Sequence, residues 1–362
     1  RVRKGYVIGL SDKPKIAPEK IKEISEICSG EETTESRLIA LAAWMRENYG
    51  STMIQALRTV LPIQEKIKAK EKKYICLDIS EEAGAQLLKE LEQTRFKART
   101  RLLRELLEKK RLDYTHAAKE LGTTSAVVKN FQEQGIIRIE YDEIMRTSLN
   151  TGDISGERRM PLTDEQEAAV KQIQREWKKP SPKPVLIEGV TGSGKTQVYI
   201  KLIEQTLSQG KEAIVLIPEI ALTYQTVRRF YARFGDKVSV INSRQSQGER
   251  YDQFKRAKKG EVQVMIGPRS ALFTPFASLG LIIIDEEHES SYKSESTPRY
   301  HARETAIRRA VLEHANVVMG SATPSVEAYS KAMNGEYSLV RLTTRYGSRP
   351  LPRVSIVDLR EE

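Results

Sequence analysis

From residue 162 onward, short apolar runs alternate with longer segments whose apolar residues have helical spacing. A continuous apolar run is typical of a strand that is buried on both faces of a parallel sheet. This alternation of strands and helices indicates an α/β fold built on a doubly wound parallel sheet. The expected strands lie near residues 185–189, 213–217, 237–241, 261–266, 281–285 and 316–319.

The first 145 residues follow a mainly helical pattern instead. Apolar residues three or four positions apart predict a helix over residues 36–48, and a shorter helix is expected over 52–60. Residues 6–10 form an alternating, strand-like run, which we expect to be the last strand of a domain. A further strand is expected over 74–79, after a lysine-rich run that favours a solvated linker or edge-strand guard over nucleic-acid contact.

Residues 81–139 predict a helical region that ends in a winged helix. A helical segment over 81–112 is followed by a helix, a glycine turn, a second helix and a strand. That order is typical of a helix-turn-helix with a wing, which can contact DNA through its second helix. The positions expected to be exposed there include one cation, Lys129, and one anion, Glu133. A scaffold or a weak backbone contact is therefore favoured over base reading.

Residues 185–196 read Val-Leu-Ile-Glu-Gly-Val-Thr-Gly-Ser-Gly-Lys-Thr, which places a glycine-rich turn between a strand and a helix. In that context the G-x-x-x-x-G-K-T pattern predicts a phosphate-binding loop. Its backbone N–H groups would point at phosphate oxygens, Lys195 would reach the outer phosphates, and the Thr196 hydroxyl would bind Mg²⁺. The residues expected to bind the nucleoside triphosphate are Gly189, Gly192, Ser193, Gly194, Lys195 and Thr196.

Residues 281–288 read Leu-Ile-Ile-Ile-Asp-Glu-Glu-His, so carboxylates follow a buried strand. Ligands bind at the carboxyl ends of strands in such sheets. Asp285 is placed to hold Mg²⁺ through water, and Glu286 to orient and deprotonate the attacking water. A solvated acidic strand end is the alternative, which the phosphate-binding loop in the same chain disfavours.

The basic composition suits a polyanionic partner, with ordinary solvated charged faces as the alternative. The chain has 362 residues, 39% hydrophobic and 30% charged, which suits a soluble cytoplasmic protein of two or three domains without a membrane span. Its net charge of +11 is spread over both halves. It does not begin with methionine, so we expect it to be cut from something longer. The two cysteines, Cys28 and Cys76, support neither a disulfide framework nor a zinc site.

The chemistry-bearing segments carry a family resemblance. The phosphate-binding loop, residues 285–288 and the Gly-Ser-Ala-Thr-Pro turn at 320–324 together resemble the first RecA-like lobe of superfamily 2 DEAH-type helicases. Further segments narrow the resemblance to the PriA family of replication-restart primosomal helicases (primosomal protein N′): 218–223, 248–250, 267–273, 288–293 and 298–303. Tyr224 and Asn242 depart from that family, which usually has proline and histidine there.

The resemblance implies an order of domains. A remnant of a DNA 3′-end-binding domain with a helical linker is expected at 1–78, a winged-helix domain at 79–145, a linker at 146–160 and helicase lobe 1 at 161–362. The family's second lobe, its arginine fingers and its zinc-binding cysteines are not in the sequence. We therefore expect this chain to bind ATP with Mg²⁺ and to hydrolyse ATP weakly.

The resemblance also implies roles for individual residues. Gln166 would read the adenine through its amide, with a helix-capping glutamine as the alternative. His288 would join the catalytic group, and Ser321 and Thr323 would link hydrolysis to motion. Single-stranded DNA would contact the sheet edge and an aromatic loop, whose polar neighbours argue against full burial of its tyrosines. The residues expected at the DNA are Glu219, Thr223, Arg269, Tyr292, Arg299, Tyr300 and His301.

The implied function is that of an ATP-dependent 3′-to-5′ DNA helicase that acts at stalled replication forks to restart replication and assemble a primosome. Its implied partners are single-stranded and forked DNA, single-stranded-DNA-binding protein, and primosome or helicase-loader proteins. Two alternatives stay open. One is a winged-helix DNA-binding regulatory module in which the nucleotide acts as a switch, and the other is a different superfamily 2 DNA translocase.

Overall fold

The computed structural model describes residues 12–13, 17–25, 32–61, 70–94, 96–144 and 161–345. The chain divides into two compact units, of which the smaller comprises residues 65–148 with 247–252. The strand expected at 6–10 and the linker expected at 146–160 lie outside the described residues. Within the described ranges, no helix combines the length and the apolar character that a membrane span needs.

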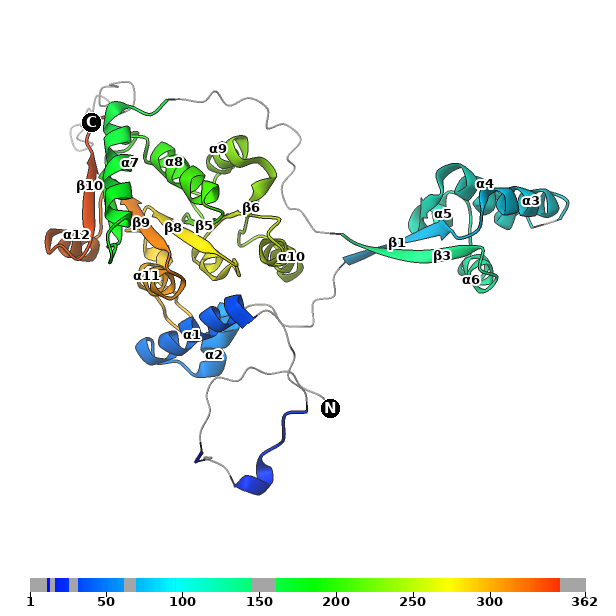
Figure 1. Ribbon diagram of the computed structural model, residues 1–362, viewed down its shortest axis with the longest axis horizontal. Coiled ribbons are helices and arrows are strands. Elements are labelled where there is room, and N and C mark those ends of the chain that lie inside the picture. The colour runs from blue at the N-terminus through cyan, green and yellow to red at the C-terminus, as the bar shows by residue number, and fades with distance from the viewer. Residues whose placement is uncertain are drawn as a thin grey trace, which may run out of the picture. The chain divides into compact units, whose positions relative to one another are not determined.

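The larger unit is built around a seven-stranded sheet in the order β10-β4-β9-β8-β5-β7-β6 (Figure 1). Every neighbouring pair in it is parallel. All six expected strands are present, and the doubly wound α/β fold is confirmed. Their bounds are β4 Val185–Gly189, β5 Glu212–Leu216, β6 Val238–Val240, β7 Val264–Gly267, β8 Leu279–Asp285 and β9 Asn316–Ser321. The seventh strand, β10 Ser338–Leu342, was not expected.

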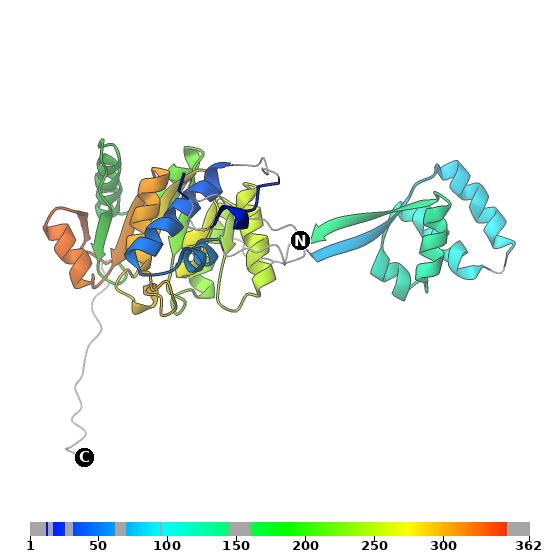
Figure 2. The ribbon, with the colours of Figure 1, turned by 90° about the horizontal axis from the view of Figure 1, so that it is seen from below.

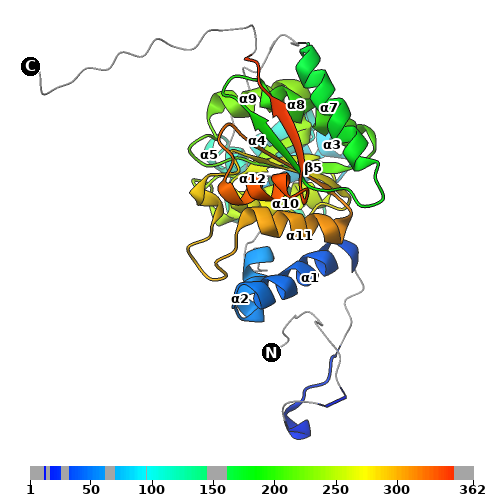
Figure 3. The same cartoon turned by 90° about the vertical axis from the view of Figure 1, so that its left-hand side faces the viewer.

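Helices cover both faces of this sheet, as Figure 3 shows. One face carries α7 (Asp164–Trp177), α8 (Lys195–Ser208) and α9 (Tyr224–Phe234). The other carries α10 (Gln247–Lys258), α11 (Ala302–Glu313) and α12 (Val326–Met333). Alternate residues along each strand point to opposite faces. Ile282 and Ile284 of β8 therefore pack in the hydrophobic cluster with α10, α11 and α12. Leu281 and Ile283 pack in the cluster with α7, α8 and α9. Short 3₁₀ turns cover Pro18–Lys20, Gly235–Lys237, Arg269–Phe273 and Ser290–Tyr292.

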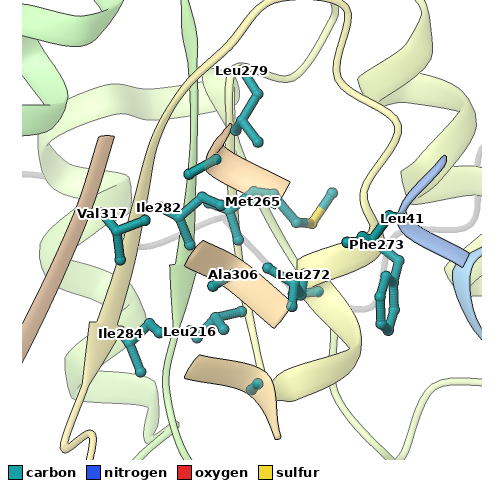
Figure 4. Packing of buried hydrophobic residues seen from close by; sticks show 14 of the residues in the cluster. Leu41, Leu216, Met265, Leu272, Phe273, Leu279, Ile282, Ile284, Ala306 and Val317 are labelled. Carbon is teal, nitrogen blue, oxygen red and sulfur yellow. The ribbon is translucent and has the colours of Figure 1, made fainter. Parts of the chain in front are cut away.

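The helical pair α1 (Glu32–Asn48) and α2 (Met53–Val60) belongs to this same unit. Leu41 of α1 lies beside Phe273 in the cluster that covers the sheet (Figure 4). Arg37 Nη1 lies 3.9 Å from Glu313 Oε2 on α11. Both predicted helices are confirmed, and both pack on the larger unit's core instead of forming a core of their own.

The smaller unit has the order of helices and strands that was expected of a winged helix, and Figure 2 shows its helices beside a long two-stranded ribbon. The sheet order is β2-β1-β3, and both pairs are antiparallel. Because β1 is the central strand, the boundary expected between residues 78 and 79 is wrong: β1 belongs to this unit. The elements are β1 Lys70–Leu77, α3 Glu81–Glu92, α4 Lys97–Lys109, β2 Arg111–Asp113, α5 Tyr114–Lys119, α6 Ser125–Glu133 and β3 Ile137–Ile144.

Candidate nucleotide and DNA site

The parallel sheet gathers the candidate residues at one edge. The carboxyl ends of β4, β8 and β9 are neighbours, because β9 pairs with both of the other strands. Asp285 at the end of β8 lies in register with Gly320 of β9, and Glu188 of β4 with Ser321. The phosphate-binding loop, the acidic strand end and the Gly-Ser-Ala-Thr-Pro turn therefore meet at the edge where ligands bind in such folds.

The phosphate-binding loop has the backbone that its glycines allow. Gly192 and Gly194 have φ angles of 83° and 82°, which side chains strongly disfavour. Lys195 is buried, and its Nζ donates a hydrogen bond to the carbonyl oxygen of Gly189 at 2.8 Å. Ser193 Oγ is buried without a hydrogen-bond partner in the structure. The start of α8 thus offers a cation and an unsatisfied hydroxyl, which suit phosphate oxygens.

Gln166 holds this loop to the start of α7. Its Oε1 accepts a hydrogen bond from Thr163 N at 3.1 Å, and its Nε2 donates to Ser193 O at 2.8 Å. The side chain is 1% exposed. The structure therefore shows the capping interaction that was the alternative to adenine reading, because both ends of the amide have partners. Contact with an adenine stays a prediction.

Asp285 carries a partly buried carboxyl group that accepts a hydrogen bond from a tyrosine. The hydroxyl of Tyr199, on α8, donates a hydrogen bond to Asp285 Oδ1 at 2.9 Å. Burial, and next the charge of Glu286, raises the pKa of Asp285 to about 6. Burial also raises the pKa of Tyr199 well above its usual value, so the hydroxyl remains a donor. Sequence reasoning missed Tyr199, although its position four residues after Lys195 places both on one face of the helix.

The next residues connect the acidic strand to the Gly-Ser-Ala-Thr-Pro turn. His288 Nδ1 lies 2.7 Å from Ser321 Oγ and 3.8 Å from Glu286 Oε2. Ser321 Oγ also accepts a hydrogen bond from Thr323 N at 3.0 Å. Glu286 has a φ of 46°, an unusual backbone angle for a residue with a side chain and one that is found at functional sites. The structure thus brings His288, Ser321 and Thr323 together.

A buried ion pair that the sequence did not suggest braces the same turn. Arg303 Nη1 donates to Glu287 Oε2 at 2.9 Å, and Ser325 N donates to Glu287 Oε1 at 2.6 Å. Arg303 Nη1 also donates to Ser325 Oγ at 2.7 Å. Buried charges persist only when they are paired and hydrogen-bonded. This network fixes the acidic strand end against the start of α12.

Several residues expected at DNA lie at the same edge. Glu219 and Thr223 are exposed after β5, and Thr223 Oγ1 also caps α9 by accepting a hydrogen bond from Thr226 N at 3.3 Å. Arg299 is exposed. Arg269 Nη1 donates to the carbonyl oxygens of Ser291 and Lys293, both at 2.8 Å. Arg269 therefore supports the aromatic loop in this structure.

The expectation that Tyr292 and Tyr300 escape full burial is wrong. They are 1% and 4% exposed, so neither ring offers a free face for a base. The hydroxyl of Tyr292 donates to the carbonyl oxygens of Leu216 at 3.0 Å and Asp285 at 2.6 Å. His301 caps α11 by accepting from Arg303 N at 3.2 Å, and burial lowers its pKa. Polar neighbours did not prevent burial, because the backbone satisfies the tyrosine hydroxyl.

In the part of the chain that the structure describes, no group of three or more His, Cys, Asp or Glu residues could hold a metal ion. Mg²⁺ ordinarily binds one or two protein oxygens together with substrate phosphates and water. Asp285 and the Thr196 hydroxyl at the start of α8 are protein groups of that kind. The residues present fit a magnesium ion that arrives with a nucleotide.

Comparisons with known proteins agree with this geometry. Residues 163–332 match the DEAD/DEAH box helicase family, and residues 1–62 match a 3′ DNA-binding domain family. The replication restart protein PriA of Bacillus subtilis is 48% identical over 67% of this chain and 30% of its own length. Those of Chlamydia muridarum and Haemophilus influenzae are 35% and 37% identical, over 91% and 78% of this chain and 44% and 38% of their own lengths. The chain spans less than half of each of these relatives.

Proposed function

The chain belongs to the PriA family of replication restart helicases, and we propose that it supplies the ATP-binding lobe of an ATP-dependent 3′-to-5′ DNA helicase that acts at stalled forks. One observation carries the proposal. A single sheet edge holds Lys195 at the phosphate-binding loop, the partly buried carboxyl group of Asp285, and the contact between His288 and Ser321. In this proposal, nucleotide binding, hydrolysis and a connection to motion share that edge.

In the proposed mechanism, the phosphates of ATP lie against the backbone from Gly192 to Thr196. Lys195 Nζ exchanges its bond to the Gly189 carbonyl oxygen for a phosphate oxygen. Asp285 and Thr196 would hold Mg²⁺, which would neutralise charge at the phosphates. Glu286 orients the attacking water and accepts its proton. We propose that Gln166 contacts the adenine, which requires its amide to leave Ser193 O.

We further propose that single-stranded or forked DNA lies along the exposed residues Glu219, Thr223 and Arg299. The match of residues 1–62 to a 3′ DNA-binding domain supports a DNA partner. Tyr292 and Tyr300 act on this surface by shaping the loop that Arg269 supports, because their own rings are buried. A primosome or helicase-loader protein and single-stranded-DNA-binding protein are the proposed protein partners, and the cytoplasm is the proposed location.

This chain by itself should bind ATP and hydrolyse it slowly. Arginine fingers that stabilise the transition state raise phosphoryl-transfer rates by about 10³-fold or more. In the family that this chain resembles, the second helicase lobe supplies them. Addition of that lobe is therefore expected to raise turnover and to make it depend on DNA.

The test compares ATP turnover with and without forked DNA, for this chain and for a chain extended through the second lobe. Lys195→Ala should remove nucleotide binding and DNA-stimulated turnover. The matched control is Lys201→Ala, which alters an exposed lysine on the same helix. The helicase function would be excluded if the extended chain showed no DNA-stimulated ATP turnover and Lys195→Ala left its turnover unchanged. If DNA binding were then retained by residues 65–148 alone, the winged-helix regulatory module would replace it.

A further inference from the structure

We infer that Tyr199 is a positioning residue for the Asp285 carboxylate, which it holds through the hydrogen bond from its hydroxyl to Oδ1 in the orientation that Mg²⁺ requires. The donor and acceptor atoms are 2.9 Å apart. This inference rests on the proposed ATP site and adds a residue to it that neither the phosphate-binding loop nor the Asp-Glu-Glu-His segment contains. Three further observations support it.

The first observation is the place of Tyr199 on α8. Tyr199 follows Lys195 by four residues, so the two side chains leave the same face of the helix. Both point toward the carboxyl edge of the sheet, where Lys195 reaches Gly189 O and Tyr199 reaches Asp285. One rigid helix therefore sets the position of the phosphate-binding cation and the orientation of the metal-binding carboxylate together.

The second observation is the burial of the tyrosine ring. Tyr199 is 1% exposed and belongs to the cluster of α7, α8 and α9 against the sheet. A ring packed in this way cannot change rotamer without disturbing its neighbours. Its hydroxyl is therefore held in place before any ligand arrives. Such fixed outer partners of metal ligands ordinarily control both their orientation and the metal affinity.

The third observation is the close approach of the hydroxyl to Gly320. A Cβ atom built on Gly320 would lie 1.7 Å from Tyr199 Oη and 2.9 Å from its Cζ. Gly320 stands in register with Asp285 on the neighbouring strand, and its carbonyl oxygen accepts a hydrogen bond from Glu287 N at 3.1 Å. The glycine that opens the Gly-Ser-Ala-Thr-Pro turn thus leaves room for the tyrosine hydroxyl beside the carboxylate.

Tyr199→Phe separates this role from packing, because phenylalanine keeps the ring and removes only the hydroxyl. The affinity of the whole 362-residue chain for a fluorescent ADP analogue should be measured in EDTA and over a Mg²⁺ titration, with the thermal midpoint as a check of the fold. We expect an unchanged affinity in EDTA and an increase of about tenfold or more in the half-saturating Mg²⁺ concentration. The electron paramagnetic resonance spectrum of Mn²⁺ bound with ADP should show a correspondingly weaker site.

Two further variants make the test decisive. Gly320→Ala displaces the hydroxyl without removing it, and should raise the half-saturating Mg²⁺ concentration in the same direction. Tyr337→Phe alters another buried tyrosine, whose ring lies beside Lys331, and should leave the Mg²⁺ titration unchanged. If Tyr199→Phe binds the analogue with the wild-type Mg²⁺ dependence, the inference is overturned while the ATP site stands. If the wild-type chain binds no nucleotide, the proposed function itself fails.

Discussion

The ring nitrogen Nδ1 of His288 lies 2.7 Å from the Oγ of Ser321, although the two residues are 33 positions apart in the sequence. The same nitrogen lies 3.8 Å from Glu286 Oε2. One imidazole therefore contacts both the carboxylate proposed to activate water and the turn that follows the next strand. We propose that a change at the γ-phosphate of bound ATP reaches the turn through this side chain.

Replacement of the imidazole should therefore uncouple hydrolysis from DNA. In a chain extended through the second lobe, His288→Ala is expected to lower the DNA stimulation of ATP turnover by about tenfold, and to leave nucleotide affinity within about twofold, because such groups act mainly in the transition state. Steady-state turnover against DNA concentration measures the effect. Ser321→Ala should lower the DNA stimulation in the same way as His288→Ala. The control is His314→Asn, at the exposed residue that caps the end of α11. Equal stimulation in His288→Ala and wild type would refute the coupling role.

Nucleotide binding with Mg²⁺ should weaken in mild acid. Burial raises the pKa of Asp285 from 3.8 to about 6, and a metal ion binds the carboxylate only after the proton has left. We expect the affinity for Mg²⁺ with nucleotide to fall steadily below about pH 6, and the affinity in EDTA to change less. Titration calorimetry at several pH values measures both affinities. An affinity for Mg²⁺ with nucleotide that stays constant between pH 5 and pH 7 would contradict this expectation.

The same pKa predicts an effect on stability. Because folding raises the pKa of Asp285, the folded protein binds more protons than the unfolded chain between about pH 4 and pH 6. The stability contributed by the protonated group is therefore lost as the pH rises through that window. Asp285→Asn should raise the free energy of unfolding at pH 8 by roughly 2 kcal/mol. Urea unfolding measures it, with the exposed Asp236→Asn as the control.

Variants of Gln166 distinguish its two roles. Gln166→Ala removes a helix cap and the bond to Ser193 O, and should lower the free energy of unfolding by about 1 kcal/mol. Gln166→Glu retains an acceptor for Thr163 N but loses the amide donor. If the amide also reads adenine, as we propose, both variants should lose the preference for ATP over GTP by about tenfold. An unchanged preference in both would leave Gln166 with its capping role alone.

The helical pair α1 and α2 should be required for stability of the larger unit. Leu41 is 0% exposed and packs in the cluster with Phe273 on the face covered by α11. Leu41→Ala is expected to cost about 2–5 kcal/mol in the free energy of unfolding. Ile54→Ala, at a residue of α2 that is 63% exposed, should change it by less than about 0.5 kcal/mol. Equal unfolding midpoints for the two variants would show that the pair does not stabilise the lobe.

The sequence predicted those elements whose signals are local. The strand β8 was evident from its unbroken apolar run, and the phosphate-binding loop from glycines that only a tight turn requires. The strand β10 was missed because it is only five residues long and includes an exposed arginine, so its apolar residues show no clear periodicity. The boundary near residue 78 was misplaced because β1 pairs with β2 and β3, which lie more than 30 positions farther along the chain.

By itself, the sequence determined the α/β fold, the glycine-rich turn between β4 and α8, the acidic end of β8 and the family. Tertiary structure alone decided that Tyr292 and Tyr300 are buried, that Tyr199 holds Asp285 beside Gly320, and that α1 and α2 complete the core of the lobe. The physical reason is the range of the interactions involved. Periodicity and turn chemistry act between residues a few positions apart, whereas burial and the pairing of polar atoms depend on which distant segments the sheet brings together.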